Sequence, residues 1–277
     1  MGKPNDPEVG DSNNPSEIWS FFPSHIIECL KNLESITLGY CYSLKFIFQL
    51  EELNFEESVR TPFPLPCLCV CVCFSKKKKK IEESQVASVL DQLRELNLYN
   101  LPKLVHIWMK GPEGISGFGN LRLLVVWGCN SLTYLFSPSI AKLLVMLEEI
   151  QVTKCEKIEE ILIRAREEEK EEKNLFHKVN SILLRDLPNL KCFCNEAIAF
   201  EWPSLEKMMV IRCPNLRTFV PSNLKTPELK GVYEDIEFKT SQWKGDLNAT
   251  IMHIFKGKVM HILTAIISLM EEFNTWV

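Results

Sequence analysis

The hydrophobic positions of this chain follow neither the 3.6-residue period of a helix nor the alternation of a strand. Over residues 93–107, LRELNLYNLPKLVHI, leucine or isoleucine occupies six regularly spaced positions, and most of the intervening residues are polar. The opening LxxLxL places three apolar side chains on one side of a short strand, and the later every-third spacing carries the chain around a tight corner. The stretch therefore predicts one coil of a repeat.

The same six-slot spacing recurs in five more copies. The anchors are Leu33, Ile36, Leu38, Cys41, Leu44 and Ile47; Leu93, Leu96, Leu98, Leu101, Leu104 and Ile107; Leu121, Leu124, Val126, Cys129, Leu132 and Leu135; Leu147, Ile150, Val152, Cys155, Ile158 and Ile161; Val179, Ile182, Leu184, Leu187, Leu190 and Phe193; and Leu205, Met208, Val210, Cys213, Leu216 and Phe219. From Leu93 onward, successive first anchors are 28, 26, 32 and 26 residues apart. These steps lie in or just beyond the roughly 20–29 residues of leucine-rich repeats, L-x-x-L-x-L-x-x-[N/C]-x-L.

This pattern predicts an α/β fold, a leucine-rich-repeat solenoid with a curved parallel sheet, short irregular coils and an irregular or helical outer face. We expect a disordered polar N-terminus over 1–17, the solenoid over 18–225 and a partly helical cap over 226–277. Within the cap, 231–244 can add a strand or two, and Asp246 is a suitable N-cap for a largely helical tail. A cap is needed because a terminal coil exposes one apolar face.

Residues 59–84 break the repeat with three prolines, four alternating cysteines and five consecutive lysines. In an extended strand Cys67 and Cys73 would lie ~20 Å apart, too far to share one tetrahedral zinc ion. Acylated cysteines beside a polybasic run would bind anionic lipid, and the lysines alone could be a nuclear address. We favour an insertion, such as a translated intron, that forms a disordered loop outside the core. Its removal shortens the step from Leu33 to Leu93 from 60 residues to 34, close to one long coil.

Two further segments interrupt the coils. Residues 111–119, GPEGISGFG, predict a linking loop and lack the spacing of a phosphate-binding loop. The charge run 166–173, REEEKEEK, either continues a helix from Glu159 or forms a solvated bulge, with a specific acidic docking site as the alternative.

Composition narrows the class of protein. The chain has 277 residues, 46% of them hydrophobic, and a formal net charge of −4, which argues neither for nor against nucleic acid. Four of the eleven cysteines fill repeat slots and four lie in the insertion, which leaves too few for a disulfide framework and favours a reducing, cytoplasmic compartment. The start matches neither a secretory signal nor a myristoylation motif. Since no apolar run reaches the ~18 residues of a membrane span, we expect none.

Motifs that carry catalysis are missing from the sequence. The five histidines form no HxxxH or HExxH arrangement, and neither a GxSxG elbow nor a GxxxxGK[ST] loop occurs. We therefore expect a chain that is not an enzyme and has no cofactor and no metal site.

The candidate site is the strand face, where the x residues of each LxxLxL point to the concave surface. The candidate partner-binding residues are Arg94, Asn97, Tyr99, Arg122, Val125, Trp127, Gln151, Lys154, Arg185, Lys207 and Arg212. Mixed charge with aromatic and aliphatic side chains suits a protein surface better than a phosphodiester backbone, so we expect no nucleic acid. Arg122 and Trp127 are candidate anchors, with the alternative that Trp127 only packs on the neighbouring coil.

The repeat texts LRELNLYNLPKLVHIW, NLRLLVVWGCNSLTYLFSPSIAKLL, LEEIQVTKCEKIEEIL and LEKMMVIRCPNLRTF, with the tail WKGDLN, carry a family resemblance. Over about 18–256, apart from the insertion, the chain resembles the C-terminal repeat region of plant intracellular nucleotide-binding leucine-rich-repeat immune receptors of the coiled-coil type. In that family a separate domain binds the nucleotide, and because its P-loop is missing here no nucleotide site is carried over.

The resemblance implies a protein-binding module that recognises a pathogen effector or a guarded host protein. It also implies a role in holding a nucleotide-binding switch closed, with the switch outside this chain. A receptor fragment, a truncated paralogue and an incorrectly predicted gene remain open. The alternative function is a general leucine-rich-repeat scaffold or adaptor, such as the substrate receptor of a ubiquitin ligase.

Overall fold

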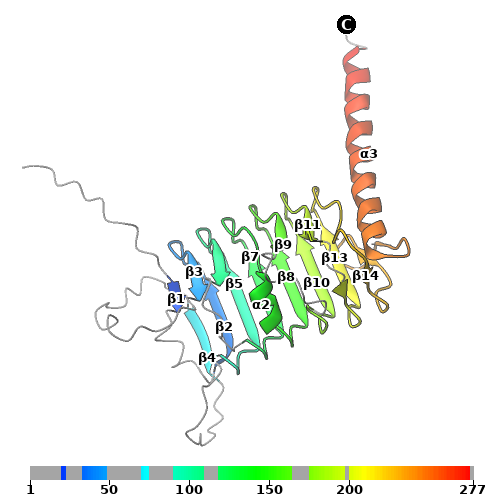
Figure 1. Ribbon diagram of the computed structural model, residues 1–277. Helices are drawn as coiled ribbons and strands as arrows, with labels where there is room; N and C mark the ends of the chain where they lie inside the picture. The colour runs from blue at the N-terminus through cyan, green and yellow to red at the C-terminus, as the bar shows by residue number, and fades with distance from the viewer. Residues whose placement is uncertain are drawn as a thin grey trace, which may run out of the picture.

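The solenoid is visible throughout the described part of the chain. The computed structural model describes residues 20–22, 33–48, 70–74, 90–108, 118–163, 175–196 and 200–274. Figure 1 shows coils stacked side by side, each contributing one strand to a common sheet. The sheet has nine strands in the order β16-β15-β13-β10-β8-β7-β5-β2-β4. The predicted leucine-rich-repeat solenoid is confirmed.

Seven neighbouring strands of this sheet are parallel. They are β2 (Leu33–Gly39), β5 (Glu95–Tyr99), β7 (Leu123–Trp127), β8 (Glu149–Thr153), β10 (Ser181–Arg185), β13 (Lys207–Ile211) and β15 (Val232–Tyr233). The two edge strands, β4 (Val70–Phe74) and β16 (Ser241–Gln242), pair antiparallel with β2 and β15 respectively. Equivalent anchors are in register, so that Ile36 is level with Leu96, and Leu96 with Leu124. Each coil therefore repeats the geometry of the one before it.

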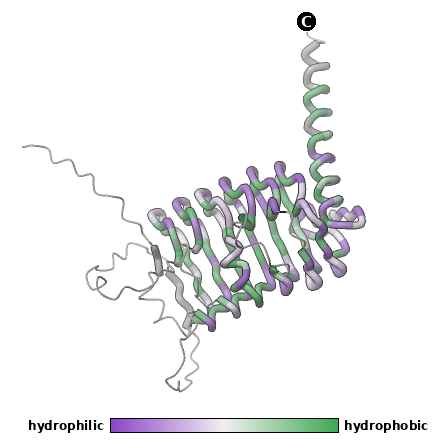
Figure 2. Tube along the Cα trace, viewed as in Figure 1, coloured by the Kyte–Doolittle hydropathy of each residue, from purple (hydrophilic) through white to green (hydrophobic). Residues whose placement is uncertain are grey.

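All the predicted anchors lie in one continuous core. The most exposed of them, Leu44, retains only 6% of its accessible surface. Figure 2 shows hydrophobic positions recurring along the strands of every coil, with polar positions gathered at the turns. Because a coil covers only its neighbours, this core is a row of layers rather than a central cluster.

Each coil buries two further positions that the six-slot pattern leaves out. One lies three residues before the first anchor, at Leu90, Phe118, Leu144, Phe176 and Trp202, and the other directly follows the last anchor, at Phe48, Trp108, Phe136, Leu162, Cys194 and Val220. The rings contact one another from coil to coil: Trp108 stacks on Phe136 at 5.9 Å between centroids, and Phe136 meets Phe176 at 5.0 Å. The indole Nε1 of Trp202 donates to the Leu175 carbonyl at 3.0 Å, which satisfies its one polar atom.

The far side of the solenoid carries only short elements in the described residues. Its strands are β1 (Ser20–Phe22), β3 (Phe46–Phe48), β6 (His106–Trp108), β9 (Glu160–Leu162), β11 (Cys192–Cys194), β12 (Phe200–Glu201) and β14 (Leu224–Lys225). One helix, α2 (Pro138–Leu143), begins after Ser137, whose hydroxyl accepts from the Ile140 amide, and has proline at its start. This matches the expected irregular or helical outer face.

The turn after each sheet strand has the same backbone conformation in six coils. Its first residue has positive φ at Tyr40, Asn100, Gly128, Lys154, Asp186 and Arg212. From Tyr40 to Asp186 the amide of this residue donates to the next coil, as Lys154 does to the Arg185 carbonyl at 3.0 Å. Gly128 is the position that needs glycine, because a Cβ there would come within 2.5 Å of Asn100 Oδ1.

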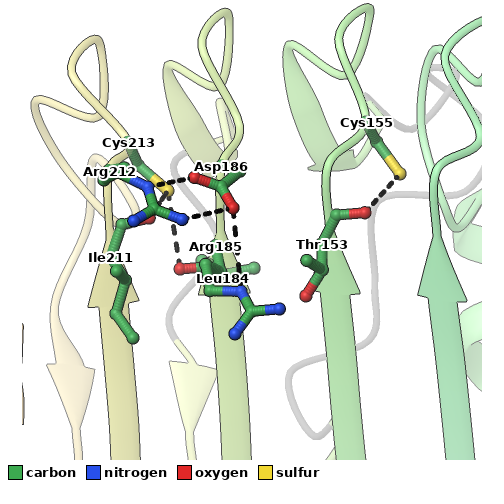
Figure 3. A network of polar contacts seen from close by, with 8 residues as sticks. All are labelled: Thr153, Cys155, Leu184, Arg185, Asp186, Ile211, Arg212 and Cys213. Atoms are coloured by element: carbon green, nitrogen blue, oxygen red, sulfur yellow. Dashed lines mark hydrogen bonds and ion pairs between the residues drawn. The ribbon is translucent and has the colours of Figure 1, made fainter. Parts of the chain in front are cut away.

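The fourth-slot cysteines follow this turn residue. Each thiol donates to the carbonyl two residues earlier, as Cys155 does to Thr153 at 3.4 Å and Cys213 to Ile211 at 3.5 Å (Figure 3). The slot thus holds a small side chain that both packs in the core and bonds to the turn backbone. Burial raises the pKa of Cys129 and Cys155 to about 12.

Two interruptions differ from what we expected. Residues 70–74, inside the segment interpreted as a disordered loop, form β4 at the edge of the sheet; the rest of 59–84 lies outside the described residues. Glu160–Leu162 is strand β9, so no helix continues from Glu159 through these residues, and 166–173 lies outside the described part. Of 111–119 only residues 118 and 119 are described, and 1–17 is outside entirely.

Helix α3 (Leu247–Asn274) closes the last coil. Asp246 is its N-cap, accepting from the Ala249 amide at 2.8 Å, as predicted. Asn248 Oδ1 accepts from the amides of Phe219 and Val220 at 3.0 and 3.1 Å, while Leu247, Ile251 and Ile254 are buried. Asn248-Ala249-Thr250 has the spacing of an N-glycosylation sequon, but Asn248 is engaged in hydrogen bonds to the last coil and Thr250 is fully buried.

The same helix changes the expectation about membranes. Among the described residues, Leu247–Ser268 is long and apolar enough to cross a bilayer by length and composition alone. The sequence interpretation counted uninterrupted apolar runs, whereas this helix includes the buried cap residues and a few polar ones. A core helix of a soluble protein meets the same criteria, so the finding is weak evidence for a span.

Candidate partner-binding face

The open face of the nine-stranded sheet carries three rows of side chains, each running across the coils. The middle row contains Thr37, Asn97, Val125, Gln151, Leu183, Met209 and Tyr233. The row toward the strand starts contains Ser35, Glu95, Leu123, Glu149, Ser181 and Lys207, and the row toward the strand ends contains Gly39, Tyr99, Trp127, Thr153, Arg185 and Ile211. We call these rows together the sheet face.

Apolar side chains lie in the middle of the sheet face on both sides of Gln151, and we call them the apolar strip. Val125, Leu183 and Met209 are half-buried, and Leu123 and Trp127 on β7 are half-buried beside them. At the β2 end the row turns polar, and Asn97 donates to the Thr37 hydroxyl at 3.4 Å. The half-exposed apolar side chains supply area that a second protein could cover, because the coil itself leaves them in contact with water.

A charged groove of about 440 Å³ lies at the starts of the strands. Its walls include Arg94, Arg122 and Glu148, and the Arg122 guanidinium donates to the Glu148 carboxylate of the next coil at 2.9 Å. The Arg122 side chain keeps 47% of its surface exposed, so the pair leaves donors free to face a partner. Nearby, Gln151 donates to Glu149 at 2.8 Å.

A larger groove of about 910 Å³ follows the strand ends. Trp127, Lys154, Asp186 and Arg212 line it from four successive coils. The Lys154 ammonium lies 5.3 Å from the centroid of the Trp127 ring, within the range of a cation–π contact. Trp127 thus contacts the neighbouring coil through Lys154 and also lines the groove.

An ion-pair network crosses the floor of this strand-end groove. Arg212 meets Asp186 on the adjacent coil with two hydrogen bonds, one of them 2.7 Å long from Nη2, and Arg185 Nε lies 3.7 Å from the same carboxylate (Figure 3). The hydrogen bond from Arg212, with the field of the nearby cations, lowers the pKa of Asp186, and burial opposes that change. Asp186 is therefore anionic at neutral pH and holds two cations in place.

The structure places five of the eleven predicted candidates in the two grooves. Trp127, Lys154 and Arg212 come together in the strand-end groove, and Arg94 and Arg122 in the strand-start groove. The remaining candidates, Asn97, Tyr99, Val125, Gln151, Arg185 and Lys207, lie on the sheet face between them. Tyr99, Trp127 and Arg185 are the last residues of their strands. Lys154 and Arg212 lie one position further along their coils, in the turn that follows the strand.

The groove residues that the sequence analysis did not select include Asp186, Glu234 and Lys258. Asp186 occupies the same turn position as Lys154 and Arg212, and this shared position was the signal that could have identified it. Glu234 and Lys258, in the cap, line the strand-end groove, and Lys258 Nζ lies 3.8 Å from Glu234. No sequence spacing connects the cap to the groove, since the contact depends on how α3 packs.

Known proteins share this repeat. The family model for plant disease resistance protein RPS2-like leucine-rich repeats matches residues 13–156 and 146–229, which together make up most of the chain. The chain belongs to this family. A probable disease resistance protein, At4g27220 of Arabidopsis thaliana, is 30% identical over 203 residues, covering 70% of this chain and 21% of the relative. No solved structure matches the chain.

Membership confirms the resemblance to plant resistance-protein repeats. The RPS2-like repeats match 146–229 as well as 13–156, so the strand-start groove lies within matched coils, as does the strand-end groove apart from Glu234 and Lys258. The matched region spans about a fifth of the relative, which is much longer than this chain. Leucine-rich-repeat solenoids are typically protein-interaction modules without catalysis.

Proposed function

We propose that this chain is a protein-binding repeat module of plant disease resistance and that it binds through its sheet face. The observation that carries the proposal is the apolar strip at Val125, Leu183 and Met209 with a charged groove on each side. Protein interfaces have this anatomy, with a more apolar centre and a polar rim. The module is non-catalytic in this proposal, because binding alone accounts for the arrangement.

The partner we propose is a pathogen effector, a guarded host protein or the nucleotide-binding domain of a receptor. In the last case the module would hold closed a switch that lies outside this chain. The compartment we propose is the cytoplasm. Cys129, Cys155, Cys192, Cys194 and Cys213 are buried thiols outside any disulfide, which suits a reducing environment.

Two side chains are suited to anchor such a partner. Trp127 presents a half-buried ring at the edge of the apolar strip, and Arg122 presents an exposed guanidinium held in place by Glu148. Trp and Arg dominate the energetics of protein interfaces, where truncation of an anchor typically costs 2 kcal/mol or more. The two anchors lie on opposite sides of the strip and would orient one partner across it.

Photo-cross-linking in leaf tissue tests the proposal. A photoreactive amino acid is placed at Val125 or Leu183 on the sheet face, and at Thr133 or Asn195 as exposed controls outside the sheet. We expect a specific cross-linked protein from the first pair, lost when Trp127→Ala or Arg122→Glu is added to a chain that still folds. Equal cross-linking from the control positions, or none from the sheet face with or without pathogen, would place the interface elsewhere.

A further inference from the structure

The outer part of α3 leaves the body of the solenoid. Its first two turns are packed on the last coil, whereas Figure 1 shows the remainder projecting away from the sheet. Large apolar side chains on this projection are exposed: Met260 by 61%, Ile267 by 56%, and Leu263 and Ile266 by 47% each. Figure 2 shows the same stretch coloured as hydrophobic. An exposed apolar surface of this kind marks a site of contact with another molecule.

The exposed side chains share one face of the helix. Val259, Leu263, Ile266 and Ile267 are spaced by three, four, seven and eight residues from one another, and Met260 lies beside them. At 3.6 residues per turn this spacing forms a continuous apolar stripe. Ala265 and Ser268, which are also exposed, lie on the opposite face. The stripe is therefore suited to pack lengthwise against another apolar helix.

The apolar run that carries this stripe is too short to span a lipid bilayer. The apolar run 259–270 has 12 residues and is ~18 Å long as a helix, against the ~30 Å of a hydrocarbon core. The residues that would complete a span include Ile251 and Ile254, which are buried against the solenoid. From 259 to 277 the sequence has no Lys or Arg, so it lacks the cations that bring interfacial helices to anionic lipid.

The charges at the two ends of the run point to a second copy of the chain. Lys256, which is exposed, precedes the run, and Glu271 and Glu272 follow it, whereas Lys258 is engaged with Glu234 of its own chain. Two such helices side by side in parallel would bring like charges together at both ends. In antiparallel order the lysine end of each helix faces the glutamate end of the other, and the stripes meet around Thr264.

We propose that two copies of this chain associate through their α3 helices, packed antiparallel along the stripe at Val259–Ile267. The solenoids then lie at opposite ends of the helix pair. The sheet face of each copy takes no part in this contact, so the association is independent of the proposed partner-binding function.

Sedimentation equilibrium of the full chain tests the association. We expect a reversible dimer of twice the 32.0 kDa chain mass. Leu263→Glu with Ile267→Glu should raise the dissociation constant at least tenfold, while the matched change Ala265→Glu with Ser268→Glu on the opposite face should leave it within about threefold. Circular dichroism confirms that all variants keep the solenoid. A wild-type chain that stays monomeric at 100 μM, or equal effects of the two pairs, would overturn the proposal.

Charge exchange tests the antiparallel order. Lys256→Glu or Glu271→Lys should each weaken the dimer, and the two changes together should restore it. Failure of the double variant to recover would refute the antiparallel order. Flotation with anionic and neutral vesicles covers the remaining outcome. A monomer that floats with either vesicle type would show that lipid, rather than a second copy, covers the stripe.

Discussion

One amide side chain, that of Asn248, makes several of the polar contacts between α3 and the last coil. Asn248 Oδ1 accepts from the amides of Phe219 and Val220 at 3.0 and 3.1 Å, and its Nδ2 donates to the Ser222 carbonyl at 3.3 Å. These backbone amides have no next coil to bond to, so the side chain takes the place of the missing strand. We therefore expect Asn248→Ala to loosen the cap and the coil beneath it.

The magnitude follows from the groups left without partners. Asn248→Ala leaves two half-buried N–H donors, each costing roughly 1–2 kcal/mol, so we expect the free energy of unfolding to fall by about 2–4 kcal/mol. Asn248→Asp is the matched control because it keeps the acceptor oxygens and loses only the donor to Ser222. A carboxylate in the first turn of a helix is also favourable by about 0.3–1 kcal/mol, so this variant should stay within about 1 kcal/mol of the parent chain.

Urea unfolding followed by circular dichroism measures the difference. The free energy comes from the midpoint and slope of each curve, compared at equal slopes so that a change in the unfolded state is not mistaken for a change in the cap. We expect Asn248→Ala to unfold at clearly lower urea than Asn248→Asp. If the two variants unfold within about 0.5 kcal/mol of each other, the Oδ1 contacts do not hold the cap and the reasoning fails.

Two further predictions concern the repeat itself. Leu184→Ala, at a fully buried anchor, should lower the free energy of unfolding by about 2–5 kcal/mol in urea melts, while Leu183→Ala on the sheet face should cost less than about half of that; equal losses would contradict the assignment of faces. Cys155, whose pKa burial raises to about 12, should resist alkylation at pH 8 until the chain unfolds, as mass spectrometry of the labelled peptides would show; rapid native labelling would contradict it.

The sequence predicted the coils well because each anchor has a fixed place in its own repeat. Leu96 and Leu184 fall into the core simply because LxxLxL makes a strand with one apolar side, and stacking buries that side. The cap was also predictable, because Asp246 signals a helix start and a final coil needs cover. Local spacing carries all of this information.

Contacts between coils were less accessible to sequence reasoning. The buried rings of Phe118 and Phe176 precede their anchors by a turn of positive φ, a conformation that no apolar spacing reveals. Strand β4 pairs antiparallel with β2 across an interruption of the repeat. The composition of residues 59–84 predicted a loop because it carries no sign of this pairing. The Asp186–Arg212 pair depends on the register between neighbouring coils, which places these equivalent turn residues side by side.

The most direct test of the account is a ladder of distances along the sheet. Spin labels, introduced through unnatural amino acids to avoid the native cysteines, pair Thr37 with Gln151, Leu183, Met209 or Tyr233, which are three, four, five and six strands away. At about 4.8 Å per strand, pulsed electron resonance should give backbone separations of roughly 14, 19, 24 and 29 Å. A linear rise confirms the in-register parallel stack, whereas distances without that order would contradict the solenoid.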